Sequence, residues 1–261
     1  MTKRTYGCFT LILFLYIFSI IFVFFNNIWH TNWNSFVSLF KDPGFYFSLR
    51  LSIITSVLTT GIAVVFGIPS AYVLSRFNFW GKPFFEILLA LPIALPASQL
   101  GLSLLTAFDT PLGVFIQKNM GLSFVYSQKG IILAQLILAV SFGVNVWKGA
   151  FSAVDGRCEQ VSRTLGASYW KTFLSITLPQ AKNGLIAGAI LAWARALGEY
   201  GAVLVFCGAF RGKTDTIPLS IFLNVSEGNI ETAIALCFIL AFVSIISIIS
   251  IRKIGYRTAI W

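Results

Sequence analysis

The chain contains long stretches without a single charged residue, and these limit what it can fold into more than any other feature. No Asp, Glu, Lys or Arg lies between Arg4 and Lys41. About 20 consecutive apolar residues form a helix that crosses the ~30 Å hydrocarbon core of a bilayer. Charged residues make up 11% of the 261 residues, against about 25% in a soluble domain. The sequence therefore indicates a membrane protein and argues against a soluble enzyme.

Six apolar runs of this kind predict six transmembrane helices in an all-α membrane protein. They cover residues 8–28, 51–75, 87–108, 130–147, 184–208 and 232–251. The connections are too short for a soluble domain, so residues 1–261 are predicted to form a single transmembrane domain. The first run follows Lys3 and Arg4, as a signal peptide would. Its apolar stretch is longer than the roughly 7–15 residues of a signal core, however, and no small-residue cleavage site follows. We therefore expect it to remain as the first span.

Prolines interrupt the third run. Pro92, Pro96 and Gly101 break its helical pattern. A proline inside a membrane helix is tolerated where neighbouring groups satisfy the freed backbone. The sequence leaves open whether this span is a kinked packing helix or a broken helix that lines a pathway.

The basic residues predict the orientation, because cytoplasmic loops of membrane proteins are enriched in Lys and Arg. With the N-terminus inside, the inner segments hold twelve Lys and Arg residues and the outer segments six, while Arg195 falls within a span. Both termini are therefore predicted to face the cytoplasm, in a multi-pass protein of the cell membrane. The net charge of +10 is assigned to loops near lipid rather than to a nucleic-acid surface.

The longest connection, which we call the inner loop, covers about residues 149–180, between the fourth and fifth spans. Asp155 suits the N-cap of a helix, and Gly166 suits the left-handed residue that ends one. A second short helix is predicted to begin at Ser168 and to end before Pro179. The pattern fits either an amphipathic hairpin on the lipid surface or a docking element for a cytoplasmic partner.

The inner loop resembles the EAA loop of ABC-importer permeases. That pattern is EAA, three residues, Gly, nine residues and then I-x-L-P. Here Gln160-Val161-Ser162 take the EAA places, Gly166 is the glycine, and Ile176-Thr177-Leu178-Pro179 follow after nine residues. The literal Glu-Ala-Ala is lost, although Glu159 lies one position earlier. The resemblance covers nearly the whole chain, because six spans and a charged inner loop before the fifth also fit.

The resemblance implies how such a chain works. Permeases of this kind pair as dimers, and each EAA loop sits in a groove of a separate ATPase that uses ATP and Mg. An extracytoplasmic binding protein delivers the substrate. The chain is therefore expected to form a homodimer with two ATPases, to bind no cofactor itself and to be no enzyme. The residues expected to couple it to the ATPase are Asp155, Glu159, Gln160, Arg163, Gly166, Ala167 and Pro179.

The fifth span carries the second informative segment, Ala194 to Ala202, which reads ARALGEYGA. Arg195 and Glu199 lie four residues apart and can pair on one helix face. Charged residues in hydrocarbon are costly unless paired or hydrated, so the pair either locks helix packing or lines a pathway. Gly198 and Gly201 would let another helix approach closely. The segment resembles the fifth-span signature of permeases for molybdate, tungstate and sulfate.

These observations predict a permease subunit that imports molybdate or tungstate by alternating access. A sulfate/thiosulfate permease is the alternative within the class. A proton-coupled secondary transporter would need several intramembrane acids and inverted repeats, neither of which the sequence shows. A non-transport membrane scaffold would leave the spacing of the inner loop unexplained.

No motif predicts catalytic residues or a metal site. The sequence has one histidine, His30, and its cysteines form no CxxC pair. They are Cys8, Cys158, Cys207 and Cys237. Cys207 and Cys237 are expected to be buried thiols that behave as small apolar side chains.

Overall fold

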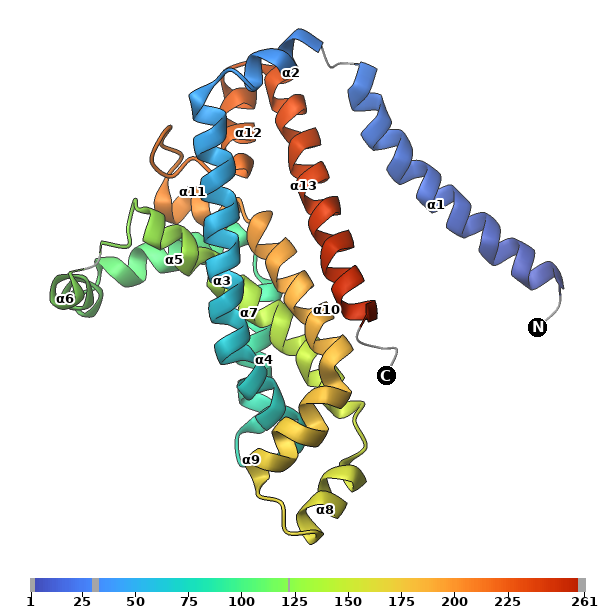
Figure 1. The fold of residues 1–261 in the computed structure, drawn as a ribbon. Helices are drawn as coiled ribbons and strands as arrows, with labels where there is room; N and C mark the ends of the chain where they lie inside the picture. Colours follow the sequence, from blue (N-terminus) through green and yellow to red (C-terminus); the bar gives the residue numbers. More distant parts are fainter. Residues whose placement is uncertain (1–2, 30–32, 122, 258–261) are drawn as a thin grey trace.

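The computed structural model describes residues 3–29, 33–121 and 123–257, and every regular element in these ranges is a helix (Figure 1). The predicted all-α class is thus confirmed for the described residues, while His30 lies outside them. The elements are α1 (Lys3–Trp29), α2 (Trp33–Leu39), α3 (Pro43–Arg76), α4 (Lys82–Ala94), α5 (Ala97–Asp109), α6 (Pro111–Met120), α7 (Gln128–Ser152), α8 (Gly156–Thr164), α9 (Tyr169–Thr172), the π-helix η1 (Phe173–Thr177), α10 (Leu178–Leu197), α11 (Gly201–Cys207), α12 (Ile217–Ser226) and α13 (Ile230–Arg257).

Among the described residues, two helices, α3 and α7, are by themselves long and apolar enough to cross a membrane. Two bent pairs bring the number of candidate spans to four. They are α4 with α5, bent by 112°, and the continuous helix of residues 169–197 with α11, bent by 51°. Among their described residues, helices α1 and α13 contain shorter apolar stretches, Phe9–Val23 and Ile230–Ile246.

The third predicted span is a broken helix rather than a kinked one. Leu95 is extended, with φ −84° and ψ 146°, and α5 restarts after Pro96. A residue that precedes proline is driven out of the helical region by the proline ring, and Pro96 has no N–H with which to continue the ladder. Pro92, by contrast, is accommodated inside α4.

The prediction that the second short helix of the inner loop ends before Pro179 is wrong. Helix α9 runs through η1 into α10 without a break, so residues 169–197 form one helix. The Leu178 N–H bonds to the Phe173 carbonyl, five residues back. This wider turn lies directly before Pro179, which occupies the first turn of α10. Proline inside a helix lacks the N–H for the next hydrogen bond, and the wider π-turn changes the hydrogen-bond pattern directly before it, so the helix continues through Pro179.

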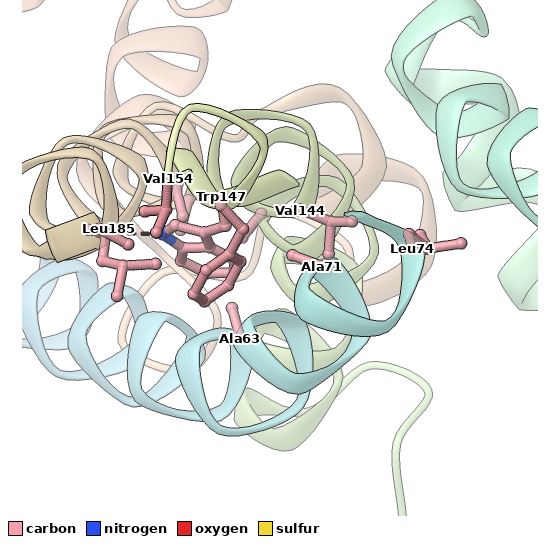
Figure 2. Close-up of a cluster of buried hydrophobic side chains, with 12 residues drawn as sticks. Ala63, Ala71, Leu74, Val144, Trp147, Val154 and Leu185 are labelled. Carbon is pink, nitrogen blue, oxygen red and sulfur yellow. Dashed lines mark hydrogen bonds between the residues drawn. The ribbon is translucent and has the colours of Figure 1, made fainter. Parts of the chain in front are cut away.

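The core lies where α3, α7 and α10 pack together. At its centre is Trp147, which is 0% exposed and donates its indole N–H to the Leu185 carbonyl at 2.9 Å (Figure 2). Three glycines surround the indole: Gly67 of α3, Gly143 of α7 and Gly188 of α10. A Cβ atom at any of them would overlap the ring, so the absence of side chains there is what gives the indole its space.

The connecting elements lie at opposite ends of this bundle (Figure 1). Helices α8 and α9 are at one end, and α2 and α12 are at the other. Helix α13 packs on α12 and α10, whereas α1 stands apart from the bundle. The predicted inner loop and the connection between α11 and α12 are therefore well separated along the bundle axis.

The two cysteines expected to be buried differ. Cys207 is fully buried among apolar side chains, as predicted, and it is a free thiol. Cys237 is also free but is exposed on α13, so the prediction of burial is wrong there. Cys237 lies on a long apolar helix. An apolar side chain on such a helix can face lipid and does not need to pack against protein.

Gly188→Ala is expected to destabilise the protein, because the added Cβ meets a fully buried, hydrogen-bonded indole. Overpacking of this kind costs about 1–3 kcal/mol. Thermal unfolding of the purified protein in detergent measures the change. The matched control is Gly149→Ala in α7, where nothing lies within 4 Å of the added atom. Equal melting temperatures for the two variants would contradict the proposed packing.

Candidate functional site

The first helix of the inner loop, α8, is closed at both ends as the sequence predicts. Asp155 is its N-cap, and the carboxylate accepts a hydrogen bond from the Arg157 N–H at 2.9 Å. Gly166 follows the helix with φ +87°. The N–H of Ala167 bonds to the Ser162 carbonyl at 3.2 Å, and that of Gly166 bonds to Arg163 at 3.0 Å. This is a Schellman motif, which needs a left-handed residue at the glycine position.

The second helix, α9, has its own N-cap and folds back on α8 through two contacts. Ser168 caps α9 by accepting from the Lys171 N–H at 3.3 Å. The hydroxyl oxygens of Ser162 and Thr172 lie 3.1 Å apart. The guanidinium carbon of Arg163 lies 4.2 Å from the centre of the Tyr169 ring. The two helices therefore hold one shape, hinged at Gly166.

Glu159 fixes this hairpin to the bundle. Its Oε1 accepts from the Arg76 Nε at 3.0 Å and from the Thr177 hydroxyl at 2.9 Å. The sequence predicts a role for Glu159 but not for Arg76 or Thr177. In the sequence, Arg76 is one of several basic residues of the inner segments, and Thr177 is the variable position of the I-x-L-P segment. A hollow of about 260 Å³ lies beside these contacts, and Gln160 and Arg163 are among its lining residues.

Large apolar side chains project from the hairpin without any cover. Leu165 is 83% exposed and Trp170 is 75% exposed, and Val161 and Tyr169 are exposed as well. We call these four residues the loop patch. A soluble surface seldom carries such a cluster unless it meets another molecule. The arrangement of a capped, rigid hairpin with an apolar face is suited to docking on another protein.

The predicted ion pair of the fifth span is present. An Arg195 guanidinium nitrogen lies 2.6 Å from Glu199 Oε2. The helix that was expected to carry both residues ends at Leu197, however. Glu199 is 1% exposed, and its other oxygen accepts from the Ala202 N–H at 2.7 Å. The carboxylate thus neutralises Arg195 and also satisfies an N–H in the first turn of α11, which stabilises the new helix start after the break.

The two glycines of this segment behave differently. Gly201 approaches the start of α5, and a Cβ there would lie 3.1 Å from both the Ala97 Cβ and the Ser98 nitrogen. Gly198 ends α10 and has no close contact with another helix, so the prediction of a close approach is wrong there. An open hollow of about 370 Å³ is lined by both glycines and by Ser98, Arg195 and Glu199. The Arg195 side chain is 27% exposed.

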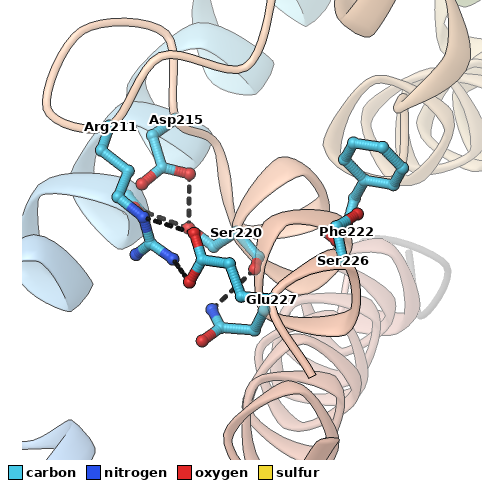
Figure 3. A network of polar contacts seen from close by, with 8 residues as sticks. Arg211, Asp215, Ser220, Phe222, Ser226 and Glu227 are labelled. Atoms are coloured by element: carbon cyan, nitrogen blue, oxygen red, sulfur yellow. Dashed lines mark hydrogen bonds and ion pairs between the residues drawn. The ribbon is translucent and has the colours of Figure 1, made fainter. Parts of the chain in front are cut away.

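A second polar cluster lies at the opposite end of the bundle from α8, beside α12 (Figures 1 and 3). Arg211 forms a 2.6 Å ion pair with Glu227, and this hydrogen bond raises the pKa of the Arg211 guanidinium. Asp215 is buried and accepts from the Ser220 hydroxyl at 2.6 Å. Burial raises the pKa of its carboxyl, although bonds from Ser220 and Ser48 oppose the shift.

Residues 63–259 match the family described as "Binding-protein-dependent transport system inner membrane component". The chain belongs to this family. It is therefore a membrane component of a transport system, as its inner loop and apolar helices predict. Membership of this family favours a binding-protein-dependent transporter over the proton-driven secondary transporter.

Three named permeases are among the relatives of this chain. The molybdate/tungstate transport system permease protein WtpB of Thermococcus kodakarensis is 38% identical over 188 residues, covering 72% of this chain and 70% of the relative. The molybdenum transport system permease protein ModB of Escherichia coli K12 is 35% identical over 214 residues, covering 81% and 93%. The sulfate transport system permease protein CysT of Escherichia coli K12 is 27% identical over 228 residues, covering 87% and 82%.

A solved structure shares the fold. The bacterial alginate ABC transporter, in complex with an alginate pentasaccharide-bound periplasmic protein, contains a chain that matches with a TM-score of 0.77 and 16% identity. The match covers 98% of this chain and 96% of that one. At this identity the likeness concerns the fold alone. The helical arrangement described above is thus that of an ABC transporter membrane subunit.

Gly166→Val is expected to disrupt the hinge of the hairpin. Nothing lies within 4 Å of an added Cβ, so the cost comes from the backbone conformation alone. A left-handed residue with a side chain costs about 1–2 kcal/mol. Transport in cells should fall while the chain remains in the membrane, and trypsin should cleave faster after the exposed Arg163.

Two variants control this experiment. Gly156→Val places the same side chain on the other end of α8, where φ is not positive and no atom is within 4 Å. Gly166→Asn should keep more transport than Gly166→Val, because Asn tolerates the left-handed region. Equal transport by the Val variants at 156 and 166 would show that the glycine hinge is unimportant.

Proposed function

We propose that this chain is the permease subunit of an ATP-driven importer of molybdate or tungstate. The observation that carries the proposal is the relation to WtpB and ModB, at 38% and 35% identity over most of the chain. The sulfate permease CysT is more distant at 27% identity, so sulfate or thiosulfate is the second candidate substrate.

In this proposal two copies of the chain form a homodimer and each docks one cytoplasmic ATPase subunit. The loop patch is the surface that suits such a partner, because exposed Trp and Tyr side chains are typical anchors of protein interfaces. ATP and Mg are used by the ATPase, and the chain itself does no covalent chemistry. Rigid capping of α8 lets the ATPase move the hairpin as one body.

An extracytoplasmic oxyanion-binding protein completes the proposed system. The alginate transporter of the same fold was crystallised with its periplasmic protein, which supports an arrangement of this kind. Arg211 and Lys213 lie in the connection before α12, at the end of the bundle opposite the loop patch. Arg211 is already paired with Glu227, so of the two it is the exposed Lys213 that would attract a dianion or an acidic docking surface.

The proposed topology has six spans with both termini in the cytoplasm. Helices α1 and α13 contain 27 and 28 residues, which is enough to supply a span each beside the four already described. The greater number of basic residues on the α8 side supports the orientation. The bent pairs then place breaks in the spans beside the hollow at Arg195, as expected where irregular backbone lines a cavity.

The membrane site for the substrate is proposed to be weak. A tetrahedral dianion needs several donors to replace its hydration, whereas Arg195 is the cation of the hollow and is already paired with Glu199. Selectivity would then reside in the binding protein. The permease would supply a transient passage rather than a tight site.

Thiol labelling tests the topology. In a background without native cysteines, Arg163→Cys should react with an impermeant reagent only from the cytoplasmic side. Lys118→Cys and Lys213→Cys should react only from outside. All three positions are exposed, so accessibility of the side chain does not limit the reaction. Labelling of position 163 in intact cells would overturn the orientation.

Transport in vesicles tests the substrate and the partners. Membrane vesicles that contain the chain and its ATPase are supplied with binding protein loaded with molybdate. Uptake and ATP hydrolysis should both rise, and free molybdate at micromolar concentration should raise neither. Tight binding of molybdate to the purified chain alone would contradict the weak site. Stimulation only by a sulfate-loaded partner would assign the chain to sulfate transport.

A further inference from the structure

One carboxylate oxygen joins three elements at the base of the bundle. Glu159 Oε1, on α8, lies 3.0 Å from Arg76 Nε and 2.9 Å from an Arg76 terminal nitrogen, at the end of α3. The same oxygen accepts from Thr177, the last residue of η1 before α10. Arg76 also donates to the Val154 carbonyl at 2.8 Å, just before α8 begins. Both ends of the contact are thus held by more than one bond.

The junction is largely buried, with the hollow of about 260 Å³ on one side of it. The Arg76 and Glu159 side chains are 16% and 14% exposed. Tyr72 lies one turn before Arg76, and its ring packs 4.7 Å from Phe173 and 5.3 Å from Phe151, centre to centre. Ion pairs with low exposure and several hydrogen bonds hold their geometry far better than pairs on an open surface. Movement of Glu159 is therefore passed to Arg76 rather than absorbed by loose side chains.

The path through this junction reaches the two long helices of the core. Helix α8 packs mainly against α9 and η1, and it has no extended packing with α3. The ion pair with Arg76 is its strong contact with α3. The bond to Thr177 is its contact with the wide turn that precedes α10. Helices α3 and α10 both border Trp147. A displacement of α8 would therefore move two of the helices that form the bundle core.

We propose that the Arg76–Glu159 pair, with Thr177, is the joint that transmits movement of α8 to α3 and α10. Arg76 and Glu159 are positioning residues in this proposal, since they touch neither ATP nor the transported ion. The inference rests on the proposed function, because it assumes that an ATPase moves α8. It adds a specific role for two residues outside the loop patch.

The test separates transmission from docking. Glu159→Gln keeps the shape of the side chain and an oxygen for Thr177, and Arg76→Gln removes the positive charge. Each variant is purified with the cognate ATPase, and hydrolysis is measured with and without molybdate-loaded binding protein. Arg76→Gln, which changes a residue of α3 outside the inner loop, should co-purify with the ATPase and keep basal hydrolysis. The stimulation by the loaded binding protein should fall by about tenfold, within the range of typical coupling between sites.

A second ion pair of the same bundle provides the control. Lys148 of α7 and Glu86 of α4 lie 2.7 Å apart, and among the described residues neither side chain bonds to α8, α9 or η1. Glu86→Gln should therefore leave the stimulation unchanged. The charge exchange Arg76→Glu with Glu159→Arg should restore part of the stimulation that each of these single substitutions removes.

The outcomes are distinct. Normal stimulation in both Gln variants would overturn the proposal, as would an equal loss in Glu86→Gln. Loss of ATPase co-purification in Arg76→Gln would also overturn it, because the pair would then act in docking. If the unmodified chain does not co-purify with an ATPase at all, the proposed function itself fails before the variants are compared.

Discussion

The buried indole of Trp147 is the contact on which the rest of the structure depends. It lies where α3, α7 and α10 meet, and glycines on all three helices make the space that it fills. Gly184 and Gly188 lie four residues apart on α10 and face Ala150 and Trp147 of α7. In a bilayer, where lipid tails are as apolar as leucine, close packing of small residues replaces the hydrophobic effect as the cause of helix association. This contact fixes the relative positions of α3, α7 and α10, the frame that positions both ends of the bundle.

Carboxylates at helix ends then connect that frame to the elements around it. Glu159 ties α8 to α3 and to η1, while Glu199 pairs with Arg195 and satisfies the first turn of α11. Each is largely buried and each receives donors from more than one residue. A buried charge that lost one of these partners would be costly, so the two junctions keep broken or hinged segments in a single arrangement. The breaks in the chain are consequently well-defined features rather than loose ones.

The sequence predicted those parts of the structure that local chemistry determines. The Asp155 cap, the left-handed Gly166 and the Ser168 cap each follow from the residues beside them, and all three were predicted correctly. Arg76, Thr177 and the glycines around Trp147 are far apart in sequence, so no spacing rule connects them. The break after Leu197 was missed because Arg195 and Glu199 have the spacing of a helical pair, and a glutamate is an unusual helix cap. Pro179 was read as a stop because the wider turn before it depends on tertiary packing.

The π-helix has a further consequence for the register of the inner loop. Residues 169–197 form one continuous rod, so the loop patch and the faces of α10 are fixed relative to each other in rotation as well as in position. Each residue of an α-helix advances the chain by about 100° around the helix axis. The turn formed by η1 holds one residue more than an α-turn. The extra residue of η1 is taken up within that turn, so a deletion there would restore an α-turn with little change in rotation. A deletion of one residue in the α-helical part of α10 would instead rotate Tyr169 and Trp170 of the loop patch by about 100° around the helix axis relative to the core.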